Sequence, residues 1–285
     1  MAAMQEVSVK SILNRSSGYL SQVCSHSLNP YIGCSLGQSL CGVACYVQHN
    51  TFLTRGRPWG SFVQAKVNAA QCYRREYARE KAWAQRQSRD FSIFLASSTD
   101  PFLPQEKSAG ITRSLLLAML DYPPQRLIVQ THSALVSQFA DLLQPLAQSC
   151  DLRVHLSIES DRDRLPGLPP PAYSVEKRLR AAALLRQQGL WVVATLAPLF
   201  PISNPATFFA RLQECVNAVV IDHFVQGDGT ALGSRTRRTA LPQAMEAVAA
   251  GSSSLDYRQQ VVEWARPYFP GRMGVGQAGF AGRYE

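Results

Sequence analysis

Short apolar runs alternate with longer amphipathic segments along most of the chain. The apolar runs have the length of buried strands and lie at residues 91–97, 126–131, 152–157, 191–196 and 218–222. Helical periodicity predicts helices at residues 111–120, 134–148, 174–188 and 205–215, and a proline-free stretch predicts an earlier helix at 61–87. Continuous apolar strands separated by helices are typical of parallel β/α units whose sheet is covered on both faces.

A further strand is expected within residues 19–28, which brings the number of β/α units to six. A closed barrel of this kind has eight units, so we expect an α/β fold built as an open, partial (β/α)6 barrel of the TIM type. Residues 26–225 would form this barrel, preceded by an N-terminal extension (1–25) and followed by a C-terminal helical extension with a Gly-rich tail (226–285). No apolar run is long enough to span a membrane and the N-terminus lacks a signal core, which predicts a cytoplasmic protein without a membrane partner.

Polar residues follow the predicted strands at the point where each strand ends. They lie at residues 97–100, 130–133, 157–160, 195–198 and 222–223. The carboxyl ends of parallel strands meet at one edge of a barrel, and this edge carries the active site in barrel enzymes. Any one of these residues could be a helix cap or a turn residue. Five such groups in register instead indicate a functional site.

Three cysteines, Cys34, Cys41 and Cys45, lie in the loop that follows the first predicted strand. Three thiolates can hold three irons of a [4Fe-4S] cluster and leave the fourth iron open for a ligand. The alternative is a zinc site with His49 or His26 as the fourth ligand. The remaining cysteines are scattered along the chain, which suits small core residues better than a disulfide framework.

The chain carries a net charge of +9, and 24 of its 29 basic residues are arginine. Arginine suits phosphate contact, so nucleic acid is a candidate partner. The densest basic stretch covers residues 73–89 and interleaves Arg and Lys with Tyr and Trp. This pattern fits a surface that binds phosphates and stacks bases. It fits equally an amphipathic helix whose arginines face water, which is the more common case.

A family resemblance emerges around the cysteines. Residues 29–34 read Asn-Pro-Tyr-x-Gly-Cys and the loop closes with Cys-Tyr at 45–46, while residues 97–106 read Ser-Ser-Thr-Asp-Pro-Phe-Leu-Pro-Gln-Glu. These segments resemble the radical S-adenosylmethionine (SAM) superfamily, and within it the spore photoproduct lyase-like branch. Thr-His-Ser at 131–133, Ser-Ile-Glu at 157–159 and Ala-Pro-Leu-Phe-Pro at 197–201 are similar to further segments of that branch, as is the tail. The resemblance extends in order over residues 26–222.

The resemblance implies a [4Fe-4S] cluster held by Cys34, Cys41 and Cys45, with SAM bound at the open iron. It implies a SAM site composed of Tyr46, Ser98, Thr99, Asp100, His132, Ser157, Glu159 and Ala197. Within this site Tyr46 and Ala197 would lie by the adenine, Ser98 and Thr99 by the methionyl amino group, and His132 and Ser157 by the carboxylate. Glu159 belongs to the strand on the ribose side. An electron donor such as flavodoxin or ferredoxin would reduce the cluster.

Three departures from the family pattern affect the chemistry. The cysteine spacing is Cys-x6-Cys-x3-Cys, where the family has Cys-x3-Cys-x2-Cys, and His132 replaces the family lysine. The strand end at 95–99 also lacks the cysteine that returns a hydrogen atom in the lyases, so their thiol-mediated repair route is not expected here. Tyr31, Tyr46 and Cys72 remain as candidate hydrogen donors.

The sequence leaves substrate and oligomeric state open. Damaged or modified nucleic acid is the leading expectation for the substrate, from the resemblance and the positive charge. A radical SAM enzyme acting on a small molecule or peptide is one alternative. The other is a non-catalytic iron–sulfur or zinc protein that binds nucleic acid.

Overall fold

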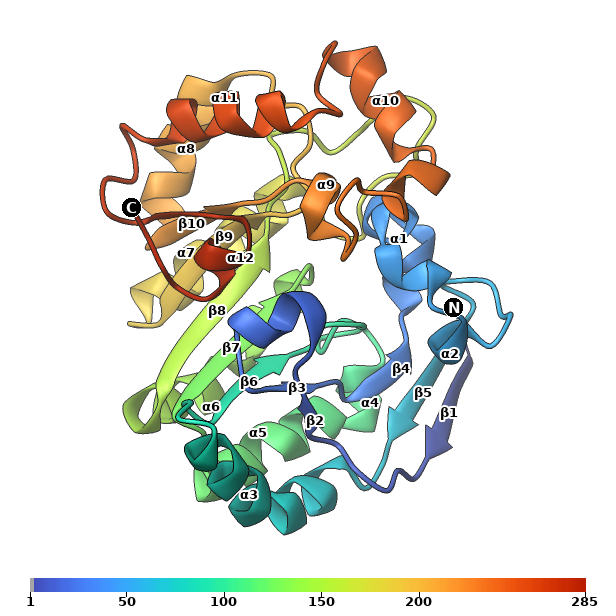
Figure 1. Ribbon diagram of the computed structural model, residues 1–285, viewed down its shortest axis with the longest axis vertical. Helices are drawn as coiled ribbons and strands as arrows, with labels where there is room; N and C mark the ends of the chain where they lie inside the picture. Colours follow the sequence, from blue (N-terminus) through green and yellow to red (C-terminus); the bar gives the residue numbers. More distant parts are fainter. Residues whose placement is uncertain (1–2) are drawn as a thin grey trace.

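The computed structural model describes residues 3–285, which form an open α/β barrel around one large sheet (Figure 1). The order of the eight strands is β11-β10-β9-β8-β7-β6-β3-β2, and neighbouring strands are parallel except at the β2–β3 edge. The strands are β2 (Asn14–Arg15), β3 (His26–Leu28), β6 (Ser92–Leu95), β7 (Arg126–Thr131), β8 (Asp151–Ser157), β9 (Trp191–Leu196), β10 (Ala218–Ile221) and β11 (Met273–Val275). The fold is therefore the partial barrel that the sequence predicts, with the Gly-rich tail adding a seventh parallel strand.

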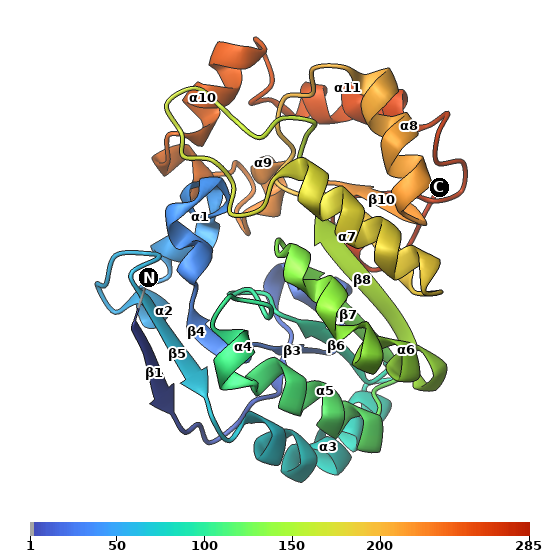
Figure 2. The same ribbon diagram turned by 180° about the vertical axis from the view of Figure 1, so that it is seen from behind.

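Helices cover the outer face of this sheet (Figure 2). They are α3 (Ala69–Arg86), α5 (Ile111–Asp121), α6 (Ala140–Ser149), α7 (Val175–Gln187), α8 (Pro205–Cys215) and α11 (Leu255–Ala265). Successive strand residues point to opposite faces. Leu127 and Val129 accordingly belong to the main core beneath the helices, whereas Ile128 lies in a smaller cluster on the inner face. Both faces of the sheet are buried, which explains the continuous apolar strands of the sequence.

The remaining helical elements are short. They are η1 (Gly18–Gln22), η2 (Ser35–Gln38), α1 (Leu40–Ala44), η3 (Tyr46–His49), α2 (Thr51–Thr54), α4 (Glu106–Ala109), η4 (Ala134–Phe139), α9 (Phe224–Gly227), η5 (Thr236–Arg238), α10 (Leu241–Val248) and α12 (Gly276–Phe280). The strand expected within 19–28 begins only at His26, and the helix expected at 134–148 begins with the 3-10 turn η4. No helix in the described part of the chain is long and apolar enough to cross a membrane.

A second, three-stranded sheet corrects the helix expected at residues 61–87. Residues Phe62–Lys66 form β5, which pairs in parallel with β1 (Ala3–Val7) and antiparallel with β4 (Tyr31–Gly33). The segment lacks any helix breaker, but strand pairing with two distant segments outweighs its local propensity. The helix starts only after Asn68, whose side chain accepts from and donates to the backbone of Val9 at 2.9 Å in each case.

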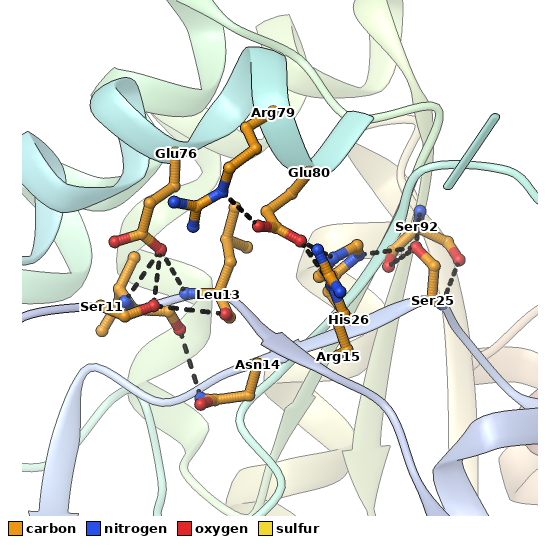
Figure 3. A network of polar contacts seen from close by, with 11 residues as sticks. Ser11, Leu13, Asn14, Arg15, Ser25, His26, Glu76, Arg79, Glu80 and Ser92 are labelled. Carbon is orange, nitrogen blue, oxygen red and sulfur yellow. Dashed lines mark hydrogen bonds and ion pairs between the residues drawn. The ribbon is translucent and has the colours of Figure 1, made fainter. Parts of the chain in front are cut away.

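Two buried glutamates on α3 hold the N-terminal segment to the barrel (Figure 3). The carboxylate of Glu76 accepts hydrogen bonds from the backbone nitrogens of Ile12 and Leu13 at 3.1 and 3.0 Å. One turn later, the carboxylate of Glu80 lies 2.9 Å from the guanidinium of Arg15 and 2.7 Å from that of Arg79, which is on the same helix. It also lies 3.2 Å from the buried ring of His26. Two carboxylates thus order the chain that leads into β3.

Acid should loosen this attachment. Burial opposes ionisation of Glu80, but hydrogen bonds from Arg15, Arg79 and His26 outweigh it and lower its pKa from 4.5 to about 2. A lowered folded pKa means that the stabilisation is complete above pH 4.5 and is lost as the pH falls toward 2. The shift corresponds to on the order of 3 kcal/mol. We expect urea unfolding of Glu80→Gln to be markedly less pH-dependent between these values than unfolding of the unchanged protein. Equal pH dependence of the two would contradict the assignment.

Candidate functional site

A cavity of about 540 Å³ opens at the carboxyl ends of the barrel strands. The Cys loop (residues 34–45) forms one wall, and the ends of β6, β7 and β9 form another. Residues from the first and last parts of the chain, Tyr19 and Phe280, also line it. The cavity therefore lies where the sequence places the strand-end polar groups.

All three cysteines of the Cys loop line this cavity. Cys34 follows β4, Cys41 lies in α1, and Cys45 follows α1. The loop folds back closely on itself. A Cβ added at Gly42 would lie only 2.0 Å from the carbonyl oxygen of Gly37. Glycine is therefore required where two parts of the loop cross. The four extra residues of the spacing form compact turns that bring the three thiols to one cavity.

The thiols lie in an environment that disfavours isolated thiolates. Burial raises the pKa of Cys45 to about 11. It also raises the pKa of Cys41 well above its usual range, and the charges of Cys45 and Cys34 add to the effect of burial. Thiolates at these positions therefore need a bound positive group. Within residues 3–285, no three His, Cys, Asp or Glu side chains are placed to hold a single metal ion. His26 is engaged by Glu80 elsewhere in the fold. His49, the other histidine of the zinc alternative, is also absent from the cavity lining that contains the three thiols, and its buried Nε2 has no hydrogen-bond partner among the described residues.

The end of β6 is bonded to the Cys loop and its flanks. Asn29 accepts a hydrogen bond from the backbone nitrogen of Ser98 at 2.8 Å, and the hydroxyl of Thr99 donates to the carbonyl of Gly33 at 2.6 Å. From the loop, the hydroxyl of Tyr46 donates to the carbonyl of Ser97 at 3.0 Å. Tyr46, Ser98 and Thr99 all line the cavity. The two most specific motifs of the sequence are thus fastened to one another.

Asp100 connects the ends of β6 and β7. Its carboxylate accepts hydrogen bonds from the backbone nitrogens of Phe102 and His132 at 2.8 Å each and from the hydroxyl of Thr131 at 2.9 Å. Burial raises its pKa, although these donors and the nearby His132 act against the rise. The side chain lies at the cavity wall, but its oxygens are largely occupied by the protein. These contacts hold the backbone of His132 in place at the end of β7.

His132 is held from the other side by Glu159. The His132 Nε2 lies 3.1 Å from Glu159 Oε1, and the buried guanidinium of Arg178 lies 2.5 Å from Glu159 Oε2. Burial opposes ionisation of Glu159, but the charge of Arg178 and the contacts with His132 outweigh it, so its pKa falls to about 2. The ionised Glu159 therefore places a negative charge directly beside the imidazole. His132 lines the main cavity, whereas Glu159 lines a small adjoining pocket.

Ser157 lies outside the surface of the main cavity. Its hydroxyl is fully buried, with the side-chain nitrogen of Gln130 at 2.9 Å and the hydroxyl of Thr195 at 3.2 Å. Gln130 itself lines the cavity, and its Oε1 has no hydrogen-bond partner among the described residues. Ala197 also lines the cavity. Gln130 thus stands between Ser157 and the cavity.

The candidate hydrogen donors are separated by the fold. Tyr31 is buried and donates to Glu106, outside the cavity lining. Cys72 is fully buried in α3 and lies 3.4 Å from the carbonyl of Val9. Of the three, only Tyr46 lines the cavity.

Two pairs of residues at the cavity were not predicted as pairs from the sequence. Tyr19 donates to the carboxylate of Asp222 at 2.8 Å, and burial raises the pKa of Asp222 to about 6. Asp228 and Arg235 form part of the wall beyond β10. Asp222 was visible as a strand-end residue. No local pattern distinguishes Tyr19, which reaches it from the N-terminal extension.

Three of the four arginines of α3 pair with carboxylates, whereas Arg86 forms no ion pair within residues 3–285. Arg74 pairs with Asp121 at 2.9 Å, Arg75 with Glu76 at 3.2 Å and Arg79 with Glu80 at 2.7 Å. On the opposite side of the helix, Tyr73 and Ala84 are fully buried. The stretch therefore agrees with the amphipathic-helix interpretation.

Comparisons with known proteins show what this architecture is similar to. No protein-family model and no curated protein sequence matches the chain. Among solved structures, a spore photoproduct lyase mutant with bound AdoMet and dinucleoside spore photoproduct aligns with a TM-score of 0.61 at 15% identity, covering 96% of this chain and 81% of that one. SuiB of Streptococcus suis bound to S-adenosylmethionine aligns with a TM-score of 0.51 at 11% identity, covering 87% and 49%. Likeness at such identities establishes architecture alone, and the chain therefore shares its fold with spore photoproduct lyase and SuiB.

Proposed function

We propose that the protein is a radical SAM enzyme that binds a [4Fe-4S] cluster through Cys34, Cys41 and Cys45. The observation that carries the proposal is the position of the three thiols, which line one cavity at the strand ends of a radical SAM fold. The remaining four cysteines are outside that cavity's lining. A reduced [4Fe-4S] cluster with one open iron supplies the electron that cleaves SAM to a 5′-deoxyadenosyl radical.

The cavity wall offers the groups that SAM needs. Tyr46 and Ala197 provide surface for the adenine, Ser98 and Thr99 provide hydroxyls for the amino group, and His132 provides a partner for the carboxylate. Asp100 and Glu159 contribute by fixing His132 from both sides. We assign Ser157 an indirect part, because Gln130 lies between it and the cavity.

Removing His132 should weaken SAM binding. The imidazole lines the cavity and is held by Glu159, whose Oε1 lies 3.1 Å from its Nε2, so the oriented ring can offer a hydrogen bond to the SAM carboxylate. We expect His132→Ala to raise the Kd for SAM by roughly tenfold or more, measured by anaerobic calorimetry on protein with full iron content. His132→Lys should retain or improve binding. Unchanged affinity in both variants would contradict the assignment.

A damaged or modified nucleic acid is the substrate class that we favour. The net charge of +9 and the architecture shared with a lyase whose structure contains a dinucleoside photoproduct support this choice. A flavodoxin or ferredoxin would supply the electron. The strand end lacks a thiol, and Cys72 lies in the core, so the hydrogen return must differ from a thiol-mediated one.

Electron paramagnetic resonance of the anaerobically reduced protein tests the proposal. Binding of SAM at the open iron should change the spectrum of the reduced cluster. A protein whose iron content is full but whose spectrum is unaffected by saturating SAM would be a non-catalytic iron–sulfur protein. A protein purified anaerobically with zinc in place of iron would overturn the proposal outright.

A further inference from the structure

A loop beyond β10, here called the mouth loop (residues 228–239), is folded around one buried carboxylate. Asp228 accepts hydrogen bonds from the backbone nitrogen of Thr230 at 2.9 Å, from its hydroxyl at 2.6 Å and from the backbone nitrogen of Thr236 at 2.8 Å. Both Asp228 and Thr236 are buried and line the cavity. The loop therefore has a fixed shape at the edge of the proposed active site.

The mouth loop presents three arginines to solvent. Arg235, Arg237 and Arg238 are exposed, and within residues 3–285 none of them forms an ion pair with a carboxylate. Arg235 donates to the carbonyl of Asp228 at 3.1 Å and Arg237 to that of Leu232 at 2.9 Å, so two of the three are held by the loop's own backbone. Three of the four arginines of α3, by contrast, are paired with carboxylates. With Asp228 as the only carboxylate of the mouth loop, positive charge is in excess beside the cavity.

Arg235 connects this charge to the cavity itself. It lines the cavity, and its guanidinium lies close to the space above Gly229, where an added Cβ would be 2.8 Å from its Nη1. Tyr46 lines the same cavity. An anionic group bound by Arg235 would therefore lie at the mouth of the cavity that Tyr46 also lines.

An exposed aromatic side chain lies on another part of the cavity's edge. Phe52 in α2 is 90% exposed, while its neighbours Asn50 and Leu53 line the cavity. Arg55, which follows this helix, is exposed and, within the described residues, likewise forms no ion pair. A positively charged edge with a solvent-facing aromatic is the combination used to bind single-stranded nucleic acid, where arginines contact phosphates and aromatics stack on bases.

We propose that the mouth loop binds the phosphodiester backbone of a single-stranded nucleic acid, with Phe52 stacking on a base that flanks the one entering the cavity. The inference rests on the proposed function, because the cavity is where the reacting group would be held. A base inside a duplex cannot reach a recessed cavity, so the strand must be single or locally opened. The phosphate contact therefore lies at the cavity mouth instead of on α3.

Fluorescence anisotropy with a labelled single-stranded 12-mer and the full chain tests this inference. Arg235→Gln, Arg237→Gln and Arg238→Gln together should weaken binding about tenfold or more and make the log–log salt slope shallower by about 2, given roughly 0.7 per phosphate contact on single strands. Phe52→Ala should weaken binding about fivefold or more. Neither change touches a buried residue, and thermal melting should show both variants folded.

Two matched controls remove the same charge elsewhere. Arg74, Arg75 and Arg79 changed together to Gln should leave the salt slope unchanged, and so should Arg180, Arg211 and Arg266. If the first control variant unfolds, the second replaces it. Arg180, Arg211 and Arg266 all lie in exposed ion pairs, so their replacement should not unfold the protein. Equal losses in the mouth-loop and control variants, or competition by polyglutamate as strong as by unlabelled 12-mer, would overturn the inference.

The outcome is separable from that of the proposed function. If the unchanged protein cleaves SAM but does not bind the 12-mer at low ionic strength, the mouth-loop inference fails alone. If it binds the 12-mer through the mouth loop but binds no iron and does not cleave SAM, the proposed function fails, while the phosphate contact stands.

Discussion

Replacing Cys34, Cys41 and Cys45 together with alanine is expected to abolish iron binding and the brown colour of the anaerobically purified protein. The three thiols line one cavity, and burial leaves each of them dependent on a bound positive group. A cluster ligated by thiolates cannot be retained without them. Iron content and the visible absorption spectrum measure the result. Cleavage of SAM should fall to background in the same variant.

Cysteines outside the cavity provide the matched controls. Cys24 is buried beside Leu20, whose carbonyl lies 3.7 Å from its sulfur, and Cys150 lies at the end of α6. Alanine at either position should leave the iron content unchanged. Near-full iron in the triple variant would contradict the ligand assignment. A loss in Cys24→Ala as large as in the triple variant would indicate a fourth protein ligand.

Replacing Arg178 with methionine is expected to destabilise the fold by about 3–5 kcal/mol, because it leaves the charge of Glu159 buried and largely uncompensated. Arg178 is 3% exposed and also donates to the carbonyl of Ser157 at 2.7 Å. Methionine preserves much of the apolar volume, so the loss reports mainly on charge and hydrogen bonding. Urea unfolding measures the free energy. The affinity for SAM should fall as well, because Glu159 fixes His132.

The control for this change lies on the same helix. Arg180 pairs with Glu176 at 2.9 Å, but its side chain is 75% exposed. Ion pairs at such positions contribute about 1 kcal/mol or less, so Arg180→Met should have a correspondingly small effect. If the two variants were equally stable, the buried Arg178–Glu159 pair would not have the role assigned to it.

The barrel itself could be predicted closely from the sequence. The expected strands at 126–131 and 191–196 and the helix at 205–215 have the observed bounds, because each is a local segment whose periodicity reports its burial. The three-stranded sheet was missed because β1, β4 and β5 are short and far apart in sequence. Their pairing is a tertiary effect that no window of residues reveals.

The candidate site was predictable where a residue follows a strand or belongs to a motif. Ser98, Thr99, His132 and Ala197 were found in this way, and the fold brings them to one cavity with the Cys loop. Tyr19 contacts Asp222 across 203 positions, so only the folded chain shows the pair. The sequence shows how many arginines a segment has, but not which of them have carboxylate partners.

Formation of 5′-deoxyadenosine tests the central claim most directly. The reconstituted protein is incubated anaerobically with SAM and dithionite, and the products are separated by liquid chromatography. The account predicts 5′-deoxyadenosine from the unchanged protein and none from the triple cysteine variant. Protein with full iron content that binds SAM but forms no 5′-deoxyadenosine above the level of the triple variant would contradict it.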